Sequence, residues 1–97
     1  MELGSLSIDM VNFIVKKDNE TLKLTATEFS LLSLLAKNRG RVLTHQYILK
    51  EVWGYGYTEQ TQYLRVFVAQ LRKKIEANPS KLFTVFLPGT DTLLFLL

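Results

Sequence analysis

The sequence predicts an α+β fold in which an amino-terminal antiparallel sheet is followed by three helices and a carboxy-terminal β-hairpin. Apolar residues alternate with polar ones over residues 3–25, which is the period of half-buried strands. Between residues 25 and 78 the apolar residues recur with helical spacing in three stretches, and two short apolar runs follow Pro79. With 97 residues, of which 47% are hydrophobic, the chain predicts one compact domain, residues 1–97, with a single core.

The amino-terminal segment predicts three short antiparallel strands. Its alternating apolar residues are Leu6, Ile8 and Met10, then Phe13 and Val15, then Leu22 and Leu24. Polar residues at 9–12 and 17–20 supply the turns, and Asp18-Asn19 suits a tight hairpin. We expect this sheet to cover one side of the core.

The first helix is predicted to begin at Thr25 and to end before Gly40. Thr25 and Glu28 match a capping box, in which the Thr25 hydroxyl accepts from the backbone N–H of Glu28 and the Glu28 carboxylate accepts from that of Thr25. Gly40 can adopt the left-handed conformation that ends a helix. The predicted buried stripe is Phe29, Leu32, Leu35 and Ala36, with Leu31 at its margin. We expect this helix to be a scaffold.

A second, shorter helix is predicted between an N-cap at Thr44 and Gly54. Its apolar face is Tyr47, Ile48, Val52 and Trp53. The candidate contacts to DNA phosphates at its start and on its outer face are Thr44, His45, Gln46 and Lys50. A single histidine is more often an ordinary surface residue, so His45 is the weakest of these candidates.

The connection to the third helix, residues 54–58, contains two glycines and two tyrosines. Either the glycines permit a sharp turn while the rings pack on the domain, or Tyr55 and Tyr57 form an exposed contact for a protein partner. The sequence leaves both interpretations open.

The third helix is predicted over about residues 59–77, because Pro79 disfavours helical geometry at Asn78 and cannot donate a backbone hydrogen bond. One narrow stripe holds Leu64, Val68, Leu71 and Ile75, with Phe67 at its edge. The opposite face holds Gln62, Arg65, Val66, Ala69 and Lys73, flanked by Arg72. Cations, an amide and small apolar groups on one face can meet DNA.

Charge is segregated along the chain. The net charge is +3, but residues 37–74 hold eight Lys or Arg against Glu51 and Glu59, a net +6, so the remainder carries −3. Neutralising phosphates requires a basic half of this kind, although a cluster of charges is by itself more often a solvated face.

Two apolar strands are predicted at residues 82–87 and 92–97, joined by Pro88-Gly89-Thr90-Asp91. Apolar residues occupy both faces of each strand. One face can cover the third helix, while the other has no evident cover within one chain. We therefore expect self-association, as a homodimer through residues 82–97.

Several classes of function are disfavoured. The chain has no cysteine and one histidine, and we find no phosphate-binding glycine loop or convincing carboxylate pair. We therefore expect neither an enzyme nor a bound cofactor or metal. No apolar run approaches the roughly 20 residues that cross a bilayer, and the amino terminus lacks signal-peptide features. We expect a cytoplasmic protein without membrane contacts.

The order of these elements is that of a winged helix-turn-helix, in which a helix pair is followed by a β wing. Within this order, the runs LTATEFSLLSLLAKNRGRVLT, ILKEVWG and YLRVFVAQLRKKIE closely resemble the carboxy-terminal effector domain of OmpR/PhoB-type response regulators. The family patterns LTxxEFxLL, VWG and LRxKΦE, where Φ is apolar, are all present in order. The resemblance extends over about residues 6–83.

This resemblance implies a transcription factor domain whose third helix enters the major groove of double-stranded DNA while the preceding helix crosses the backbone. The positions that it places at or near bases and phosphates are Thr61, Gln62, Arg65, Val66, Ala69 and Arg72. It also implies that the 54–58 loop, with Tyr55 and Tyr57, can meet RNA polymerase.

Side-chain chemistry suggests a role for each position. Arg65 can read guanine, Gln62 can pair with adenine, and Val66 or Ala69 can touch a thymine methyl. The residues more suited to phosphates are Arg72, Lys73 and Lys74.

The match fails at the wing. Family members usually end in a stretch like Thr-x-x-Gly-x-Gly-Tyr-Arg-Phe, whose Arg enters the minor groove, whereas residues 86–95 here read FLPGTDTLLF. With Asp91 at its tip, we expect the wing to repel phosphate. The family's receiver domain is absent from the chain, so we expect a fragment of a longer regulator.

Two functions remain in view. The first is sequence-specific DNA binding in transcription regulation. The alternative is a degenerate winged helix that acts as a protein-interaction or dimerisation module with weak DNA binding.

Overall fold

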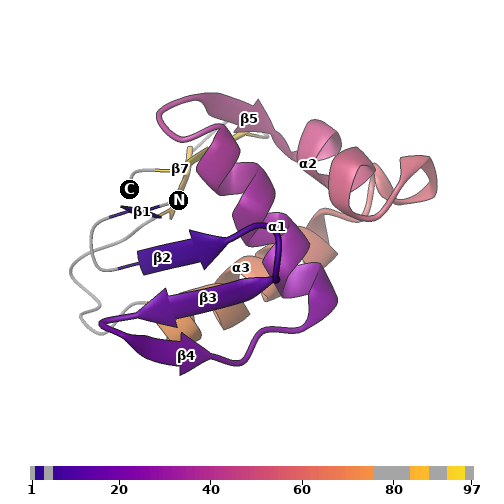
Figure 1. The fold of residues 1–97 in the computed structure, drawn as a ribbon. Helices are drawn as coiled ribbons and strands as arrows, with labels where there is room; N and C mark the ends of the chain where they lie inside the picture. Colours follow the sequence, from indigo (N-terminus) through magenta and orange to yellow (C-terminus); the bar gives the residue numbers. More distant parts are fainter. Residues whose placement is uncertain (1, 4–5, 76–83, 88–91, 96–97) are drawn as a thin grey trace.

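The computed structural model describes residues 2–3, 6–75, 84–87 and 92–95. In the described residues, two antiparallel sheets and three α-helices surround one core. Helix α1 (Ala26–Lys37) crosses the middle of the molecule, with the amino-terminal sheet on one side and β5 (Val42–Thr44) on the other (Figure 1). The core draws on both sheets and on all three helices. This is a winged helix-turn-helix arrangement, and it confirms the predicted fold class.

The amino-terminal sheet has four strands in the order β1-β2-β3-β4, one more than predicted. The strands are β1 (Glu2–Leu3), β2 (Leu6–Asp9), β3 (Ile14–Lys17) and β4 (Glu20–Leu22). Strand β1 was missed because two residues are too few to show an alternating pattern. Leu6, Ile8 and Val15 are buried as predicted.

Both predicted turns of this sheet form. The Asp9 carboxylate accepts from the backbone N–H groups of Val11 and Asn12, at 3.0 Å and 3.0 Å. Asp18 and Asn19 have φ angles of 50° and 68°, the left-handed pair that a two-residue hairpin with a type I′ turn requires.

Phe13 departs from its predicted place in the alternation. It lies in the β2–β3 turn with φ 57° and is 73% exposed. Its ring stands edge-on to Phe29, with centroids 5.4 Å apart. Because the turn, not the strand, sets its direction, Phe13 lies over the surface of α1 instead of entering the core.

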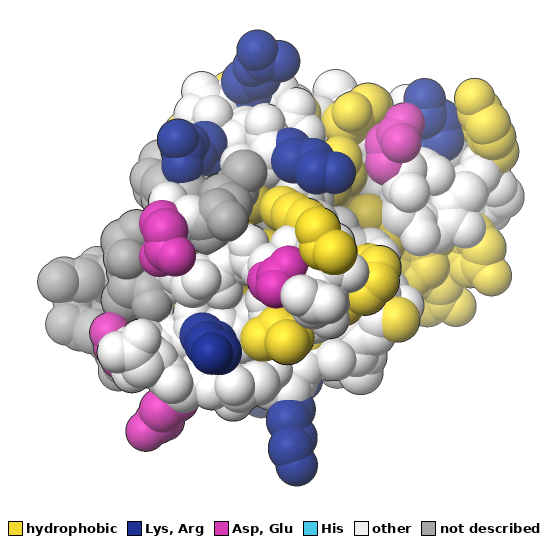
Figure 2. Space-filling model, in the orientation of Figure 1, with side chains coloured by type: hydrophobic (Ala, Val, Ile, Leu, Met, Phe, Trp, Pro, Cys, Tyr) yellow, Lys and Arg dark blue, Asp and Glu magenta, His cyan; other side chains and the backbone are white. Residues whose placement is uncertain are grey.

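A groove with both apolar and polar lining lies where the β2–β3 turn meets α1 and α2 (His45–Val52). Figure 2 shows hydrophobic side chains gathered on this face, between the strands and the helices. Its apolar lining includes Met10, Phe13, Phe29, Leu34 and Val52. The polar lining is Ser30, Ser33, Lys37 and Glu51, so the one cation among these described residues is accompanied by a carboxylate. The groove therefore does not enter the candidate site below.

The capping box of α1 is confirmed. The backbone N–H of Glu28 donates to Thr25 Oγ1 at 3.2 Å, and that of Thr25 donates to Glu28 Oε1 at 2.9 Å. Leu31, expected at the margin of the buried stripe, has no exposed surface. Because α1 is covered from more than one side, its buried surface is wider than one stripe. Gly40, with φ 77°, follows the helix as predicted.

The carboxy-terminal hairpin belongs to a three-stranded sheet with the order β5-β7-β6. The strands are β5 (Val42–Thr44), β6 (Thr84–Phe86) and β7 (Thr92–Phe95). β7 pairs with β6 as predicted and also with β5, which the prediction missed. Leu93 of β7 has no exposed surface and joins the core. The outer parts of the predicted strands and the tip at Asp91 lie outside the described residues.

The second and third helices lie where the sequence placed them. Thr44 caps α2, because its Oγ1 accepts from the backbone N–H of Tyr47 at 3.1 Å. A short 3₁₀ helix, η1 (Tyr55–Tyr57), precedes α3 (Thr61–Ile75), and the predicted end of α3 at Asn78 falls outside the described residues. In the part of the chain that the structure describes, no helix is long and apolar enough to cross a membrane.

Trp53 lies at the end of α2 and is only partly buried against the core. Its ring meets Phe67 of α3 edge-on, with centroids 5.2 Å apart. We expect Trp53→Ala to lower the free energy of unfolding by about 2–3 kcal/mol, below the range for a fully buried tryptophan. Urea denaturation measures this. Tyr55→Ala, at a ring that is 81% exposed, should leave the midpoint unchanged, and an equal loss in both variants would contradict the assignment.

Candidate nucleic-acid interface

The two faces of α3 are sharply different. Its buried residues are Leu64, Val68, Leu71 and Ile75, all at most 4% exposed. This confirms the predicted core stripe, and Phe67 lies partly buried at its edge. Because the stripe fixes which side of the helix faces inward, it also fixes which side faces solvent.

The outward face of α3 carries the candidate DNA contacts. Its exposed residues are Gln62, Arg65, Val66, Ala69 and Lys73, while Thr61 and Arg72 at its borders are half-buried. An amide, a guanidinium and small apolar groups lie toward the start of this face, and basic residues gather in the last turn. The face can therefore offer hydrogen bonds and apolar contacts at one end and positive charge at the other. These positions remain predictions as DNA contacts.

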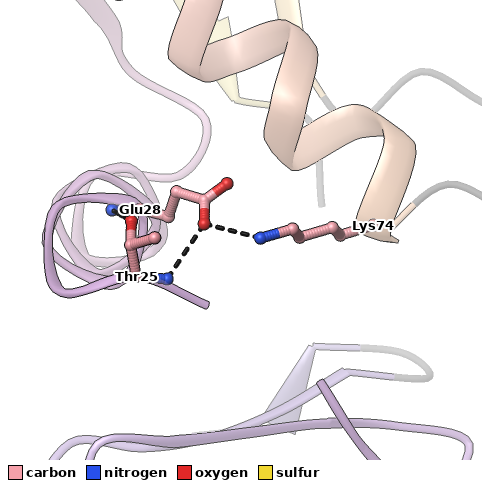
Figure 3. Close-up of polar contacts among 3 residues, drawn as sticks. All are labelled: Thr25, Glu28 and Lys74. Atoms are coloured by element: carbon pink, nitrogen blue, oxygen red, sulfur yellow. Dashed lines mark hydrogen bonds and ion pairs between the residues drawn. The ribbon is translucent and has the colours of Figure 1, made fainter. Parts of the chain in front are cut away.

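The structure corrects the prediction for Lys74. Its Nζ lies 2.7 Å from Oε1 of Glu28, so the ammonium points toward α1 (Figure 3). Lys74 follows Lys73 by one residue, which rotates it about 100° around the helix. Its side chain is 37% exposed, but its charge is balanced by the buried Glu28, and this ion pair joins α3 to α1.

The structure also corrects the prediction for His45, which is 1% exposed. His45, Ile48 and Leu49 share the buried face of α2, at the spacing i, i+3 and i+4. A side chain on that face does not reach DNA. The same spacing was present in the sequence and could have placed His45 inside. Thr44 and Gln46 remain exposed at the start of the helix.

The loop before α3 presents aromatic rings to solvent. Tyr55 is 81% exposed, and Lys50 Nζ lies 5.5 Å from the centroid of its ring and 5.7 Å from that of Tyr47. Tyr57 instead lies beside Tyr63 of α3, with ring centroids 5.9 Å apart. Of the two interpretations of this loop, packing on the domain describes Tyr57 better and an exposed contact describes Tyr55 better.

Glu28 is a buried carboxylate whose charge is balanced by its neighbours. Burial by itself raises its pKa, but the hydrogen bond from Lys74, the backbone N–H of Thr25 and the charge of Lys74 outweigh burial and hold the pKa below 4.5. The carboxylate therefore stays ionised at neutral pH and stabilises the fold there.

We expect Glu28→Gln to lower the free energy of unfolding by about 1–2 kcal/mol at neutral pH, because the partner Lys74 is partly exposed. A depressed folded-state pKa gives stability that is complete above the unfolded-state pKa and is lost as pH falls through the folded-state pKa. The difference between wild type and variant should therefore shrink as the pH falls below 4.5. Urea denaturation across that range measures it, and a constant difference would contradict the assignment.

The fold and the outward basic face of α3 together define a winged-helix domain of the helix-turn-helix class. Residues 19–89 match the protein family described as "Transcriptional regulatory protein, C terminal", and the chain belongs to this family. The family agrees with the resemblance found in the sequence.

Two similar proteins are named as transcriptional regulatory proteins. The chain is 45% identical over 80 residues to the transcriptional regulatory protein KdpE of Mycobacterium tuberculosis, covering 82% of this chain and 35% of KdpE. It is 33% identical over 81 residues to the KDP operon regulator KdpE of Escherichia coli, covering 84% of this chain and 36% of that relative. The chain thus spans about a third of the length of these relatives.

Solved structures share the whole fold. The RstA DNA-binding domain of Klebsiella pneumoniae, in complex with the RstA box, matches with a TM-score of 0.85 at 28% identity, covering 99% of this chain and 95% of that one. The DNA-binding domain of CpxR from E. coli matches with a TM-score of 0.85 at 28% identity, covering 99% and 94%.

Proposed function

We propose that this domain binds double-stranded DNA in a sequence-specific manner, as the effector domain of a two-component transcriptional regulator. The observation that carries the proposal is the outward face of α3, which is held opposite a fully buried stripe and offers both base-reading groups and cations. An α-helix fits the major groove of B-DNA. The similar RstA DNA-binding domain, solved in complex with the RstA box, supports DNA binding by this domain.

Each position on α3 has a proposed role. Arg65 reads a guanine through two hydrogen bonds, Gln62 pairs with an adenine, and Val66 or Ala69 contacts a thymine methyl. The residues proposed to position the helix on the backbone are Thr61, Arg72, Lys73 and, at the start of α2, Thr44. Lys74 and His45 leave this set for the reasons given above.

Selection of binding sites from random duplex DNA tests the proposal. A sequence-specific domain enriches one motif, and the enriched duplex binds at least about 1,000-fold more tightly than random DNA. If the wild-type domain enriches no motif after repeated rounds of selection, the proposal is contradicted.

We propose that the domain has no enzymatic activity of its own and that, as a DNA-binding module of a bacterial-type regulator, it acts in the cytoplasm.

We further propose that the 54–58 loop contacts RNA polymerase, with Tyr55 as the main contact. Tyr55 is the more exposed of the two loop tyrosines, and Lys50 lies beside its ring. Tyr55→Ala is expected to leave DNA affinity unchanged while lowering transcription from the selected site in a purified system. Tyr47→Ala, which removes the neighbouring ring only, is the matched control. Full transcription with the Tyr55 variant would assign the loop to packing alone.

A second candidate is a homodimer through the carboxy-terminal strands. β7 is paired on both sides, whereas β6 has β7 as its one neighbour among the described strands. An edge strand can pair with another copy of the chain. Light scattering over a concentration series tests this, with Phe86→Pro to block strand pairing at the outer edge of β6. The backbone N–H of Leu87 donates to Thr92 of β7, so the N–H of the preceding residue points away from β7. A wild-type chain that stays monomeric at high micromolar concentration would exclude the dimer.

A further inference from the structure

Two contacts from distant parts of the chain meet at the carboxy-terminal end of α3. Lys74 Nζ binds Glu28 Oε1, 46 positions away in the sequence, at 2.7 Å. Lys17 Nζ, on β3, donates to the carbonyl oxygen of Ile75, 58 positions away. The last two described residues of α3 are therefore held by α1 and by the amino-terminal sheet.

Glu28 is a rigid anchor because the first turn of α1 fixes it. Its side chain is 2% exposed, and the same oxygen, Oε1, accepts from Lys74 and from the backbone N–H of Thr25 (Figure 3). Its backbone N–H in turn donates to Thr25 Oγ1. The carboxylate therefore cannot follow Lys74 without breaking the cap of α1.

Lys17 makes the second of these two contacts, with the backbone carbonyl of Ile75. The carbonyl groups in the last turn of a helix lack partners within the helix and carry partial negative charge. A lysine ammonium satisfies one of them and is favoured there by the helix dipole. The strand that carries Lys17 is paired on both sides in its sheet, so the backbone from which this donor extends is held in place.

The direction of these contacts matters for the outward face. The buried stripe of α3 is held by hydrophobic packing, which has no preferred direction and allows a helix to roll slightly. Hydrogen bonds and ion pairs are directional, and Lys74 lies on the flank of the helix, between its buried and outward faces. The directional contact of Lys74 with Glu28 at this flank therefore fixes the roll of α3, which is its rotation about its own axis. Arg65 lies nine residues earlier, about 14 Å along the axis, and turns with the helix as one body.

We propose that Glu28 and Lys17 are positioning residues for DNA recognition, which set the roll of α3 and hence the alignment of Gln62 and Arg65 with base edges. This inference rests on the proposed function. It assigns to these residues an effect on sequence discrimination that is separate from their effect on stability. Base contacts need close alignment, whereas phosphate contacts tolerate small rotations of the helix. Loss of the Lys74–Glu28 contact or of the Lys17–Ile75 contact should therefore lower specific binding and spare non-specific binding.

The test measures affinity for the selected duplex and for a random duplex, at a temperature where every variant is folded by circular dichroism. Glu28→Gln keeps an acceptor for Thr25 and removes the charge that holds Lys74. Lys17→Met removes the donor to Ile75 and keeps the length of the side chain. Each variant is expected to lower the ratio of the two affinities about tenfold, the discrimination carried by one base contact. For Glu28→Gln, release of Lys74 should leave random-duplex binding at least as tight as in wild type.

Two control variants separate the effect of positioning from the effect of a change in net charge. Glu51→Gln makes the same change in net charge at an exposed carboxylate that pairs with Lys50 on α2, and should keep the wild-type ratio. Lys74→Arg keeps a cation opposite Glu28 and should also keep it. A wild-type ratio in both Glu28→Gln and Lys17→Met would overturn the inference and leave the contacts with a structural role only. Failure of the wild-type domain to discriminate at all would overturn the proposed function, and this inference with it.

Discussion

Leu64→Ala is expected to lower the free energy of unfolding by about 2–5 kcal/mol, a large part of the 5–15 kcal/mol typical of a small domain. Leu64 has no exposed surface and lies in the stripe by which α3 meets the core. Truncation removes buried methyl groups and leaves a cavity that the surrounding helices fill only in part. Urea denaturation followed by circular dichroism measures the loss.

Val66→Ala on the same helix is the matched control. Val66 is 43% exposed on the outward face, so its truncation should change stability by less than about 0.5 kcal/mol. A Leu64→Ala domain that unfolds at the wild-type midpoint would show that α3 does not pack through this stripe, and the outward face would then be wrongly assigned.

Unlike Leu64→Ala, Arg65→Ala is expected to leave the free energy of unfolding unchanged and to weaken binding to the selected duplex by about 1–3 kcal/mol. Arg65 is exposed one residue after Leu64, about 100° around the helix from it. If its guanidinium reads one guanine, the variant should also lose its preference at one base pair. Competition binding with duplexes substituted at each position measures both effects.

Lys16→Ala is the control for charge, since Lys16 is an exposed cation on β3 in the amino-terminal sheet. It should leave discrimination between bases unchanged. Equal weakening of Arg65→Ala on every duplex would make Arg65 a phosphate contact instead, and unchanged binding would remove it from the interface.

Local signals in the sequence were enough to predict most of the fold. The capping box of Thr25 and Glu28, the Asp18-Asn19 hairpin and the stripe of α3 each depend on residues close together in the chain, and each is confirmed. β5 was missed because its three residues pair with β7, about fifty positions away. Such pairing leaves no local period to detect.

Only part of the candidate site was predicted correctly from the sequence. The outward face of α3 followed from helical spacing, because burying one side of an amphipathic helix exposes the other. The spacing of His45 with Ile48 and Leu49 indicated burial, but the polar side chain was read as a surface contact. The pairing of Lys74 with Glu28 joins residues 46 positions apart, and no pattern in the sequence marks it.

The central claim, that the outward face of α3 binds duplex DNA by sequence, is tested most directly by a salt titration of binding to the selected duplex and to a random duplex. The claim predicts that the logarithm of each affinity falls linearly with the logarithm of salt concentration, with a slope of about −0.9 for each phosphate contact. Arg72→Ala and Lys73→Ala should each make that slope shallower by about 1. The selected duplex should remain the tighter ligand at every salt concentration. Weak binding that is equal for both duplexes and insensitive to salt would contradict the claim and favour a protein-interaction module.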